Sequence, residues 1–491
     1  MKYHIVQLGC QMNISDGERV QKVLEEIGYV PTDIEEDANI IGVIACSVRQ
    51  KGIDKVYNLV NKWNKWKNKK NLITFLSGCV LPSDEEKFLK LFDMVFEISQ
   101  LPELPEMISQ YGIVTPAGIQ TLYSDLKLHK AENETHHDPA EYKINSVQIK
   151  PTTKSKLNKL HTGIEEFWQI EPKYTSAFEA YIPIQNGCDK FCTYCAVPYT
   201  RGREVSRPSA EIMSELKNLV SKGVKSITIL GQNVNSYGLD KKGNEISFAE
   251  LLKQIGEFGM ESGKYFWVYF TSPHPRDMSD DVIEMIAKYD CLAKQIHLPV
   301  QSGDDNVLVR MNRNHSMLKY RDIVKTIKRL IPNATLFTDI IVGFTDETEE
   351  EFANTLNLMG EFKYNMAYIA QYSPRPGAKS SRWEDNVLKE EKKERYHRLT
   401  SEMTKYTHAY NRNLIGKTVK VLVKGNDRKT GYLSAYTEGR IVARFASADK
   451  NLIGQFVVIK ITSAASLSVE GKLFENSKAD RISDAGMNIE F

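Results

Sequence analysis

Several features are scarce in this sequence of 491 residues, and each absence excludes a class of protein. No apolar run approaches the roughly 18 residues that a membrane-spanning helix needs, and the N-terminus MKYHIVQLGC lacks the length and flanks of a signal peptide. We therefore expect a cytoplasmic protein with no membrane partner. Lysine and arginine exceed aspartate and glutamate only by 65 to 63, so a surface for polyanions would have to be local.

Cysteine is also scarce, with seven residues in the chain. An odd and small number argues against a disulfide framework and favours metal or redox chemistry. Three of the seven, Cys188, Cys192 and Cys195, lie in the stretch GCDKFCTYC. A closed zinc site needs four ligands, and no second cysteine pair or nearby histidine follows. A 4Fe-4S cluster held by three thiolates keeps one iron open, so this spacing favours a cluster over zinc or a purely structural role.

The N-terminal block alternates apolar strands with amphipathic helices. Strands are expected over 2–9, 39–45 and 71–78, and helices over 16–28, 51–63 and 84–92. This βαβαβ pattern predicts a parallel sheet.

A cysteine follows each of these strands, namely Cys10, Cys46 and Cys79, at intervals of 36 and 33 residues. Parallel strands at that period place all three thiols on the rim where open α/β sheets hold their ligands. A single cysteine after a strand is more often a core residue. Three in equivalent positions favour a shared metal or cluster site.

A second and longer alternation follows a polar stretch that we interpret as a linker or insertion. Six strands are expected over 180–186, 226–232, 266–272, 295–301, 336–344 and 366–373, with helices between them. Six β/α units predict an incomplete TIM-like (β/α)6 barrel, whose active site would lie at the carboxyl ends of its strands. GCDKFCTYC follows the first strand and is therefore expected at the mouth of this barrel.

The C-terminal part is expected to be a long helix over 388–417 and then a β-rich block. Residues 411–472 contain eleven lysines and arginines but four aspartates and glutamates, a local charge of +7. In a chain that is nearly neutral overall, this concentration favours contact with RNA phosphates over a merely solvated strand face. The basic strands, interleaved with Tyr432, Tyr436 and Phe445, resemble the small TRAM barrel of RNA-modifying enzymes.

The C-x3-C-x2-C motif on the first barrel strand resembles the radical S-adenosylmethionine (radical SAM) superfamily. Further motifs are similar to those of its methylthiotransferases, most closely the MiaB type, which acts on N6-dimethylallyladenosine in tRNA. These motifs are GCQMN, ACSVR, SGC, LGQNVNSYG, TSPHP, HLPVQSGDDNVLVRMNR, DIIVGFTDETEEEF and YSPRPG. Together they cover nearly the whole chain.

The resemblance implies two 4Fe-4S clusters and S-adenosylmethionine as cofactors. The cluster on Cys188, Cys192 and Cys195 would bind S-adenosylmethionine at its open iron and generate a radical, and an apolar C–H bond does need such a cofactor. The second cluster, on the other three cysteines named above, would carry the sulfur to be transferred. The implied partners are the tRNA anticodon stem-loop, a low-potential electron donor such as flavodoxin or ferredoxin, and a sulfur donor. The implied state is a monomer.

Other residues match the family motifs at or just after strand ends. Gln232, Asn233, Ser272, Gln301 and Asp339 could hydrogen-bond S-adenosylmethionine or the target nucleotide, or could instead cap helices and hold loops. Tyr194 could cover the cofactor or simply pack. Cys291 lies outside both triads, and we interpret it as structural.

The sequence departs from the family pattern in three places. Ile44-Ala45 stands where the family commonly has Asn-Thr, Thr345-Asp346 replaces Pro-Gly, and the linker is much longer than usual. The first departure puts polar support of the N-terminal cluster in doubt.

We expect six segments: an N-terminal methylthiotransferase domain (1–112), a linker or insertion (113–177), a radical SAM barrel (178–390), a connecting helix (391–410), a TRAM domain (411–474) and a tail (475–491). The expected activity is insertion of a methylthio group at carbon 2 of N6-dimethylallyladenosine at tRNA position 37. Threonylcarbamoyl-adenosine in tRNA or an aspartate of a ribosomal protein remain alternative substrates. A non-catalytic iron-sulfur or zinc tRNA-binding protein remains an alternative of another class.

Overall fold

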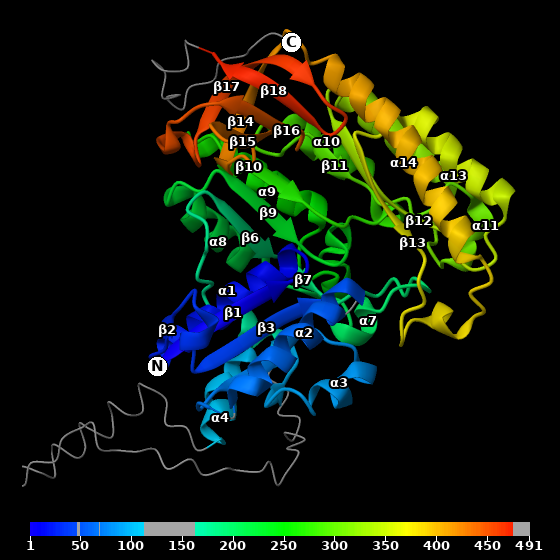
Figure 1. The fold of residues 1–491 in the computed structure, drawn as a ribbon. Coiled ribbons are helices and arrows are strands. Elements are labelled where there is room, and N and C mark those ends of the chain that lie inside the picture. The colour runs from blue at the N-terminus through cyan, green and yellow to red at the C-terminus, as the bar shows by residue number, and fades with distance from the viewer. Residues whose placement is uncertain (47–49, 68, 112–162, 475–491) are drawn as a thin grey trace, which may run out of the picture. The chain divides into compact units, whose positions relative to one another are not determined.

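The computed structural model describes residues 1–46, 50–67, 69–111 and 163–474 (Figure 1). They form two compact units: an N-terminal unit of Met1–Thr175 with Tyr199–Arg201, and a C-terminal unit of Ser176–Pro198 with Gly202–Phe491. Within the described residues, no helix is both long enough and apolar enough to pass through a membrane.

The N-terminal unit contains a five-stranded sheet in which all neighbouring strands are parallel. The three predicted strands are confirmed at its centre, and two-residue strands that the sequence did not reveal extend it on both sides. The order is β2-β1-β3-β4-β5, with bounds β1 (Lys2–Leu8), β2 (Val30–Pro31), β3 (Ile40–Cys46), β4 (Ile73–Cys79) and β5 (Met94–Val95).

Apolar side chains hold helix α2 (Gln50–Lys67) against this sheet. Val56, Val60 and Trp63 are spaced at helical intervals and pack with Val43 of β3 and Leu76 of β4 in one buried cluster. Burial of such side chains is the main favourable term in folding. It fixes the two strands whose last residues are Cys46 and Cys79.

Helix α1 (Gln11–Glu26) begins earlier than predicted, immediately after Cys10. The reason is a capping box: the Asn13 side chain accepts a hydrogen bond from the Cys10 backbone N–H at 3.3 Å, and Cys10 is the N-cap residue. Further helices of the unit are α3 (Pro82–Phe88), α4 (Leu104–Ser109) and α6 (Ile164–Gln169).

The sequence predicted a linker or insertion over 113–177, and the last part of this segment is ordered, as in an insertion rather than a linker. Residues 113–162, with the predicted His136 and His137, lie outside the described residues. Helix α6 follows them and buries Phe167 and Trp168 in the N-terminal unit. Two large aromatic side chains supply the core contacts that a linker lacks.

The C-terminal unit contains the six predicted parallel strands, in two groups of three. The orders are β6-β9-β10 and β11-β12-β13, and a parallel bridge between Val268 and Leu292 lies between the groups. This confirms the incomplete barrel. The bounds are β6 (Glu179–Pro183), β9 (Ser226–Leu230), β10 (Trp267–Phe270), β11 (Gln295–His297), β12 (Thr335–Val342) and β13 (Met366–Gln371).

Helices connect these strands, as the alternating pattern predicts. They are α8 (Ser209–Ser221), α9 (Phe248–Glu261), α10 (Asp280–Lys288), α12 (Met317–Leu330) and α13 (Glu349–Phe362), with the short α11 (Asp305–Arg310) added before α12. A small antiparallel pair, β7 (Gln185–Asn186) with β8 (Val205–Ser206), brackets the cysteine loop. Short helix α7 (Val197–Thr200) follows that loop.

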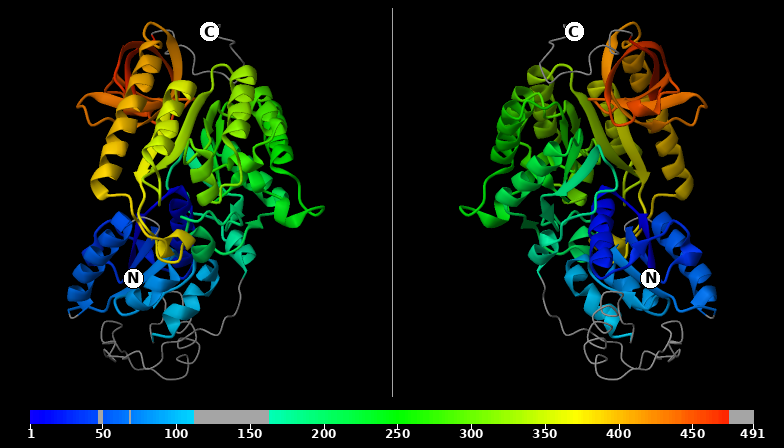
Figure 2. Two further views of the ribbon diagram at one scale, coloured as in Figure 1. Left: turned by 90° about the vertical axis from the view of Figure 1, so that its right-hand side faces the viewer. Right: turned by 90° about the vertical axis from the view of Figure 1, so that its left-hand side faces the viewer.

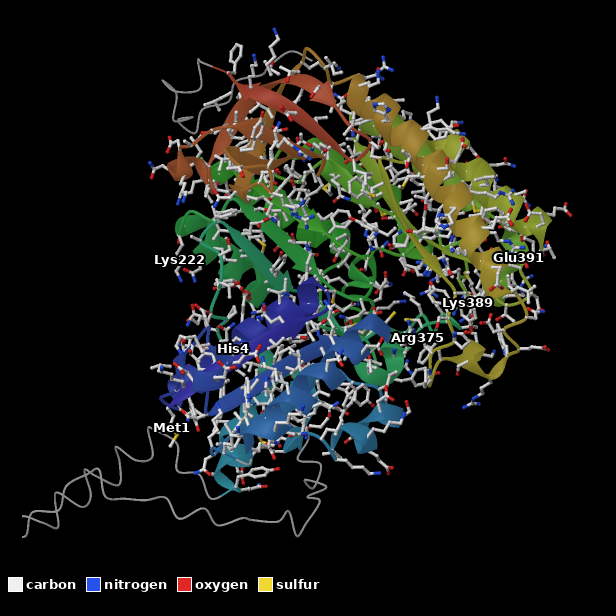
Figure 3. The ribbon with its side chains drawn as sticks, viewed as in Figure 1. Met1, His4, Lys222, Arg375, Lys389 and Glu391 are labelled. Carbon is white, nitrogen blue, oxygen red and sulfur yellow. The ribbon has the colours of Figure 1, made fainter. Side chains whose placement is uncertain are left out.

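The predicted long helix is α14 (Lys389–Arg412), which runs beside α13 and β13 (Figures 1 and 2). Lys389 and Glu391 lie at its first turn (Figure 3). Glu391 pairs with Arg395, whose guanidinium is buried and also donates to Glu347 Oε2 at 2.9 Å. A buried carboxylate partner satisfies the charge that this helix carries into the packed interface.

The last five strands close into a small barrel in the order β14-β15-β16-β18-β17. Its β15-β16 turn packs against the (β/α)6 strands: Tyr269 Oη donates to the Glu438 carbonyl at 3.0 Å, and Thr335 Oγ1 donates to that of Gly439 at 2.8 Å. The bounds are β14 (Thr418–Asn426), β15 (Tyr432–Thr437), β16 (Val442–Ala446), β17 (Phe456–Ala464) and β18 (Ser468–Leu473).

Candidate functional site: two cysteine triads

The barrel triad, Cys188, Cys192 and Cys195, lies in the loop that leaves the first strand of the (β/α)6 barrel. Cys188 and Cys192 are buried, and Cys195 is half-buried. The loop is tied down through Thr193, whose N–H donates to the Met311 carbonyl at 3.0 Å and whose hydroxyl donates to that of Arg310 at 2.8 Å. These bonds anchor the loop to the C-terminal end of helix α11.

Burial makes free thiolates unfavourable in this loop. It raises the pKa of Cys188 to about 11, and burial together with the charge of Cys192 raises the pKa of Cys195 to about 12. The repulsion also shows that the thiols lie close enough to influence one another. Thiolates here therefore need positive charge beside them, such as that of iron ions.

A polar network connects the barrel triad with the mouth of the barrel. Lys190, between the first two cysteines, forms an ion pair with Asp277 at 2.7 Å, and both side chains are nearly buried. Asn233 Nδ2 donates to the same carboxylate at 2.9 Å. The sequence analysis selected Asn233 but missed Lys190 and Asp277. Lys190 lies inside GCDKFCTYC and Asp277 two residues after TSPHP, and neither has a periodicity that would mark it.

Of the other predicted residues of the mouth, Ser272 and Gln301 lie after the ends of β10 and β11, whereas Asp339 lies inside β12. Gln301 bridges to β12, its N–H donating to the Asp339 carbonyl at 2.9 Å, and the Asp339 carboxylate lies 3.0 Å from His297 Nε2. Ser272 and Gln301 have left-handed backbone conformations, with φ of 59° and 72°. Non-glycine residues rarely adopt this region, and such strain gathers at functional sites.

Several buried polar atoms near this mouth have no hydrogen-bond partner in the described part of the chain. Within the described residues, Gln232 Oε1, Asn233 Oδ1 and the Nε2 atoms of His274 and His315 are buried without a hydrogen bond. A native protein rarely leaves such atoms unsatisfied, so these point to a polar ligand. Burial and the nearby Arg313 lower the pKa of both histidines, that of His315 to about 4, which keeps the rings neutral.

The N-terminal triad, Cys10, Cys46 and Cys79, is assembled by strand register. Cys46 and Cys79 are direct partners in the parallel β3-β4 pair, and Cys10 follows β1, the neighbour of β3. A hydrogen bond with Cys46, and then burial, raises the pKa of Cys79. Cys10 has exposed surface, yet the protein around its thiol removes enough water to raise its pKa, and Cys79 adds repulsion. All three thiols therefore interact.

Polar side chains support this triad despite the apolar Ile44-Ala45 before Cys46. Asn13 Oδ1 accepts from the Cys10 thiol at 3.3 Å, and its Nδ2 donates to the Ala45 carbonyl at 3.1 Å. Arg201 Nε donates to Cys79 Sγ at 3.0 Å, and its guanidinium pairs with the buried Asp16. The doubt raised by the missing Asn-Thr pair is thus answered by groups from other elements.

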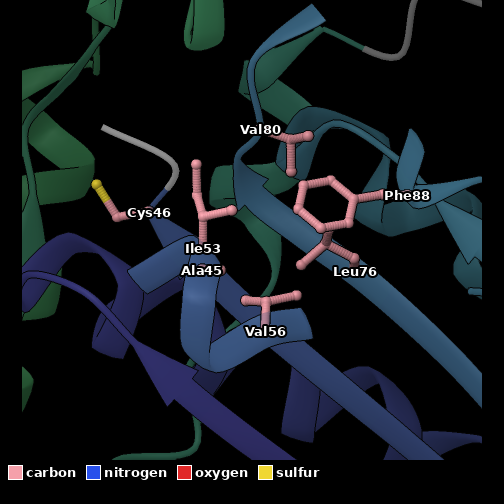
Figure 4. Close-up of a pocket in the computed structure, with 7 residues that line it drawn as sticks. All are labelled: Ala45, Cys46, Ile53, Val56, Leu76, Val80 and Phe88. Carbon is pink, nitrogen blue, oxygen red and sulfur yellow. The ribbon is translucent and has the colours of Figure 1, made fainter. Parts of the chain in front are cut away.

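An apolar pocket lies on the other side of Cys46 (Figure 4). Its lining consists of Ala45, Cys46, Ile53, Val56, Leu76, Val80 and Phe88.

Neither triad has the geometry of a site for a single ion. Within the described residues, no three His, Cys, Asp or Glu side chains converge on one metal position. A four-iron cluster makes a different demand, because each thiolate binds its own iron and the sulfurs do not meet at one atom. The donor sets fit such a cluster: three thiols each, mutually interacting, with a buried arginine at Cys79 and another, Arg313, at Cys192.

Cys291, which the sequence analysis interpreted as structural, lies away from these contacts. Its thiol is 3.8 Å from the Ile255 carbonyl, and burial raises its pKa to about 11. Tyr194 packs edge-on against Phe344 in a buried cluster. Of its two predicted roles, packing is therefore realised in the structure.

Three models of known protein families match this chain, each over a different part. Residues 2–98 match the model of "Uncharacterized protein family UPF0004", residues 182–359 that of the radical SAM superfamily, and residues 412–474 that of the TRAM domain. The cysteine triad in the loop after the first strand of a six-stranded parallel barrel, together with the match to the radical SAM model, makes this a radical SAM protein. Such a domain implies a 4Fe-4S cluster and S-adenosylmethionine, and the TRAM domain indicates RNA binding.

Similar proteins that align over nearly the full chain identify the family within the radical SAM superfamily. A "tRNA-2-methylthio-N(6)-dimethylallyladenosine synthase" of Clostridium botulinum strain Langeland is 38% identical over 476 residues, covering 96% of each chain. One of Francisella tularensis subsp. novicida is 35% identical over 481 residues, covering 96% of this chain and 99% of its own. The chain belongs to the tRNA-2-methylthio-N(6)-dimethylallyladenosine synthase family. Among solved structures, the radical SAM methyltransferase TsrM from Kitasatospora setae aligns with a TM-score of 0.47 and 11% identity, covering 77% of this chain and 73% of its own.

Proposed function

We propose that this protein inserts a methylthio group at carbon 2 of N6-dimethylallyladenosine at position 37 of tRNA, next to the anticodon. The observation that carries the proposal is the alignment of synthases of that name over 96% of the chain at 38% identity. The names of these relatives favour the dimethylallyl substrate over threonylcarbamoyl-adenosine or a ribosomal protein. An enzyme rather than a passive binding protein is favoured by the buried and polar barrel mouth.

Two 4Fe-4S clusters, one on each triad, are the proposed cofactors together with S-adenosylmethionine. When bound, they supply a radical that removes hydrogen from the C–H bond, and the sulfur and methyl group that replace it. In this chain, Cys188, Cys192 and Cys195 would hold the first cluster and Cys10, Cys46 and Cys79 the second. Asn13 would orient Cys10, and the Lys190–Asp277 pair would orient the barrel loop.

The polar mouth residues are proposed to bind the cofactor or the nucleotide. Gln232 and Asn233 offer buried carbonyl oxygens without partners, suited to accept hydrogen bonds from an amine or from adenine. Ser272 and Gln301, which follow later strands, and Asp339, which lies inside β12, would contact another part of the ligand. Burial of this mouth would exclude water from the reaction.

The TRAM domain is proposed to hold the tRNA anticodon stem-loop through part of its basic surface. Three basic side chains of this domain contact the (β/α)6 barrel instead. Lys420 lies over the Tyr265 ring, Lys424 forms an ion pair with Glu179, and Arg440 lies over the Tyr269 ring. Phe445 lies in the core of the small TRAM barrel, and Tyr436 is buried against the (β/α)6 strands. Neither side chain can therefore stack on a base. Among the described residues of this domain, the exposed cations that have no such contact with the (β/α)6 barrel are Arg412, Lys417, Arg428, Lys429, Lys450, Lys460 and Lys472.

A low-potential electron donor such as flavodoxin or ferredoxin and a separate sulfur donor complete the proposed partners. We further propose a monomer in the cytoplasm, with the domain boundaries given in the sequence analysis except that residues 163–175 are counted with the N-terminal unit.

Two experiments test the proposal. Mass spectrometry of tRNA nucleosides from cells lacking this protein should find N6-dimethylallyladenosine without its methylthio group; an unchanged methylthio nucleoside would contradict the substrate. Anaerobic reconstitution should give about eight irons per chain, two cubanes. Zinc, or a single cluster in a protein with all six cysteines, would contradict the two-cluster assignment.

A further inference from the structure

Each cysteine triad has one buried arginine that donates to a sulfur. Arg201 Nε donates to Cys79 Sγ at 3.0 Å, and Arg313 Nη1 donates to Cys192 Sγ at 3.5 Å. Both guanidiniums are almost fully removed from water. Hydrogen bonds and charge at the thiolates are two of the levers by which a protein sets the reduction potential of an iron-sulfur cluster.

The two arginines differ in their counterions. Arg201 is paired with Asp16, whose side chain is fully buried, so the two charges cancel locally. Arg313 Nη2 donates to the Pro299 carbonyl at 2.7 Å, which is a neutral partner. Among the described residues, no carboxylate lies within ion-pair distance of Arg313, and its Nε has no hydrogen bond.

The neighbours of Arg313 do not compensate its charge either. His274 and His315 face it as neutral rings, and Lys190 nearby is already matched by Asp277. Its remaining titratable neighbours among the described residues are thiols and phenols rather than carboxylates, namely Cys192, Cys195, Tyr194 and Tyr320. A buried cation without a counterion is costly, and it indicates that negative charge arrives with a ligand.

A cluster on three thiolates brings that negative charge, and reduction by one electron increases it further. We propose that Arg313 is a positioning residue whose uncompensated charge raises the reduction potential of the barrel-triad cluster, whereas Arg201, neutralised by Asp16, raises that of the N-terminal cluster less. This inference rests on the proposed function, because it assumes a cluster on each triad. The pattern would favour delivery of the electron from the low-potential donor to the barrel-triad cluster, the one that uses it.

The test uses full-length protein with one triad removed at a time. C10A/C46A/C79A isolates the barrel-triad cluster, and C188A/C192A/C195A isolates the other. Arg313→Met and Arg313→Lys enter the first background; Arg201→Met and Asp16→Asn enter the second. Midpoint potentials are measured by redox titration with EPR detection, without S-adenosylmethionine, so that any contact of Arg313 with that cofactor plays no part. Iron and sulfide contents are matched before comparison.

R313M should shift the midpoint of the barrel-triad cluster to more negative values, and R313K, which keeps the charge, should shift it less. R201M should shift the other cluster less than R313M shifts its own. D16N should shift it to more positive values, because it exposes the charge of Arg201. An unchanged potential in R313M, or equal shifts in R313M and R201M, would overturn the inference.

Assembly failures are separated from failures of the inference. If R313M takes up no iron, R313Q and R313K are compared, and equal potentials in the neutral and charged variants would overturn it. If C188A/C192A/C195A protein takes up no cluster, the two-cluster proposal fails, and with it the comparative half of the inference. The effect of Arg313 on the potential of the barrel-triad cluster is then still measured in the C10A/C46A/C79A protein.

Discussion

The two cysteine triads differ in how the chain brings them together. The barrel triad occupies eight residues of a single loop, 188–195, whereas the N-terminal triad combines residues from 10 to 79 through three parallel strands. A local site depends mainly on the conformation of its own loop. A site built by register depends on the whole sheet, because a slip of one residue would turn Cys46 or Cys79 to the other face.

The supporting groups differ in the same way. Asn312 Nδ2 donates to the Phe191 carbonyl at 3.0 Å and so fixes the backbone of the barrel loop. The N-terminal triad is supported through its sulfurs, by Asn13 at Cys10 and by Arg201 at Cys79, which is 122 residues away in sequence. The second triad therefore needs more of the chain to be folded before its ligands are in place.

The largest expected effect separates the chemistry of the triads. Cys192→Ser should abolish both S-adenosylmethionine cleavage and methylthio transfer, whereas Cys79→Ser should abolish transfer but still release 5′-deoxyadenosine, because only the barrel triad would bind S-adenosylmethionine at its cluster. Each variant should retain about half of the roughly eight irons. Chromatography of 5′-deoxyadenosine, nucleoside mass spectrometry and iron analysis measure the three quantities.

Cys291→Ser is the matched control, because this thiol lies outside both triads, near the Ile255 carbonyl. It should keep its iron and both activities. Loss of iron in this variant, or loss of 5′-deoxyadenosine in C79S with the barrel-triad cluster intact, would contradict the division of roles.

A smaller effect is expected when the buried ion pair of the N-terminal triad is broken. Asp16→Asn leaves Arg201 without its carboxylate, and breaking a buried pair in this way costs about 3–5 kcal/mol. The loss of unfolding free energy should be larger in the iron-free protein than in the reconstituted protein, where a thiolate-bound cluster supplies negative charge beside Arg201. Denaturant unfolding of both forms measures it, and equal losses in the two forms would argue against a cluster at Cys79.

Sequence patterns predicted what depends on long apolar runs or on spacing. The central strands were found because they are continuous buried segments, and both triads because cysteines recur at loop or βαβ intervals. The edge strands β2 and β5 were missed because two residues carry no periodicity. The early start of α1 was missed because its cap is the unusual Cys10, although Asn13 at the third helical position was a readable capping signal.

Arg201, Arg313, Lys190 and Asp277 could not be predicted in the same way. Arg201, Arg313 and Lys190 are single charged residues in loops or turns. Asp277 ends the short 3-10 helix Pro275–Asp277. Charge in such places usually indicates solvent exposure. Their burial follows from tertiary packing, such as the contact of Arg201 with Asp16 across 185 residues of sequence. Only the three-dimensional structure brings such groups to the cysteines.

The glycines before the cysteines should give a smaller and more local effect. Gly78 has φ of +106°, and a Cβ added there would lie 2.5 Å from the Ala45 carbonyl oxygen. Gly187 has φ of +81°, and a Cβ added there would lie 2.0 Å from the Arg203 carbonyl oxygen. Alanine at either position should cost about 1–3 kcal/mol from backbone strain, with the clash in addition. G78A should reduce iron binding by the N-terminal triad and G187A by the barrel triad, measured in the single-triad backgrounds.

Gly202→Ala is the matched control for both glycines. Its φ of +75° imposes the same left-handed conformation, but no atom lies within 4 Å of the added Cβ. It should cost only about 1–2 kcal/mol and leave iron binding unchanged. If G202A lost as much iron as G187A, the close contact at Gly187 would not be what holds the barrel loop.

The smallest effect is expected at a second ion pair, beside the barrel triad. Arg203 pairs with Asp189 at 2.7 Å, but their side chains are 74% and 33% exposed, against 2% and 0% for Arg201 and Asp16. Water and salt screen such a surface pair, so Asp189→Asn should leave iron content and melting temperature close to those of the wild type.

Although partial burial opposes it, the hydrogen bond from Arg203 lowers the pKa of Asp189. Any small stabilisation is therefore present at neutral pH and lost as the pH falls through this lowered pKa, so melting curves of variant and wild type should coincide in acid. A loss at neutral pH as large as that of D16N would mean that charge pairing as such, rather than burial beside a cysteine, distinguishes the two triads.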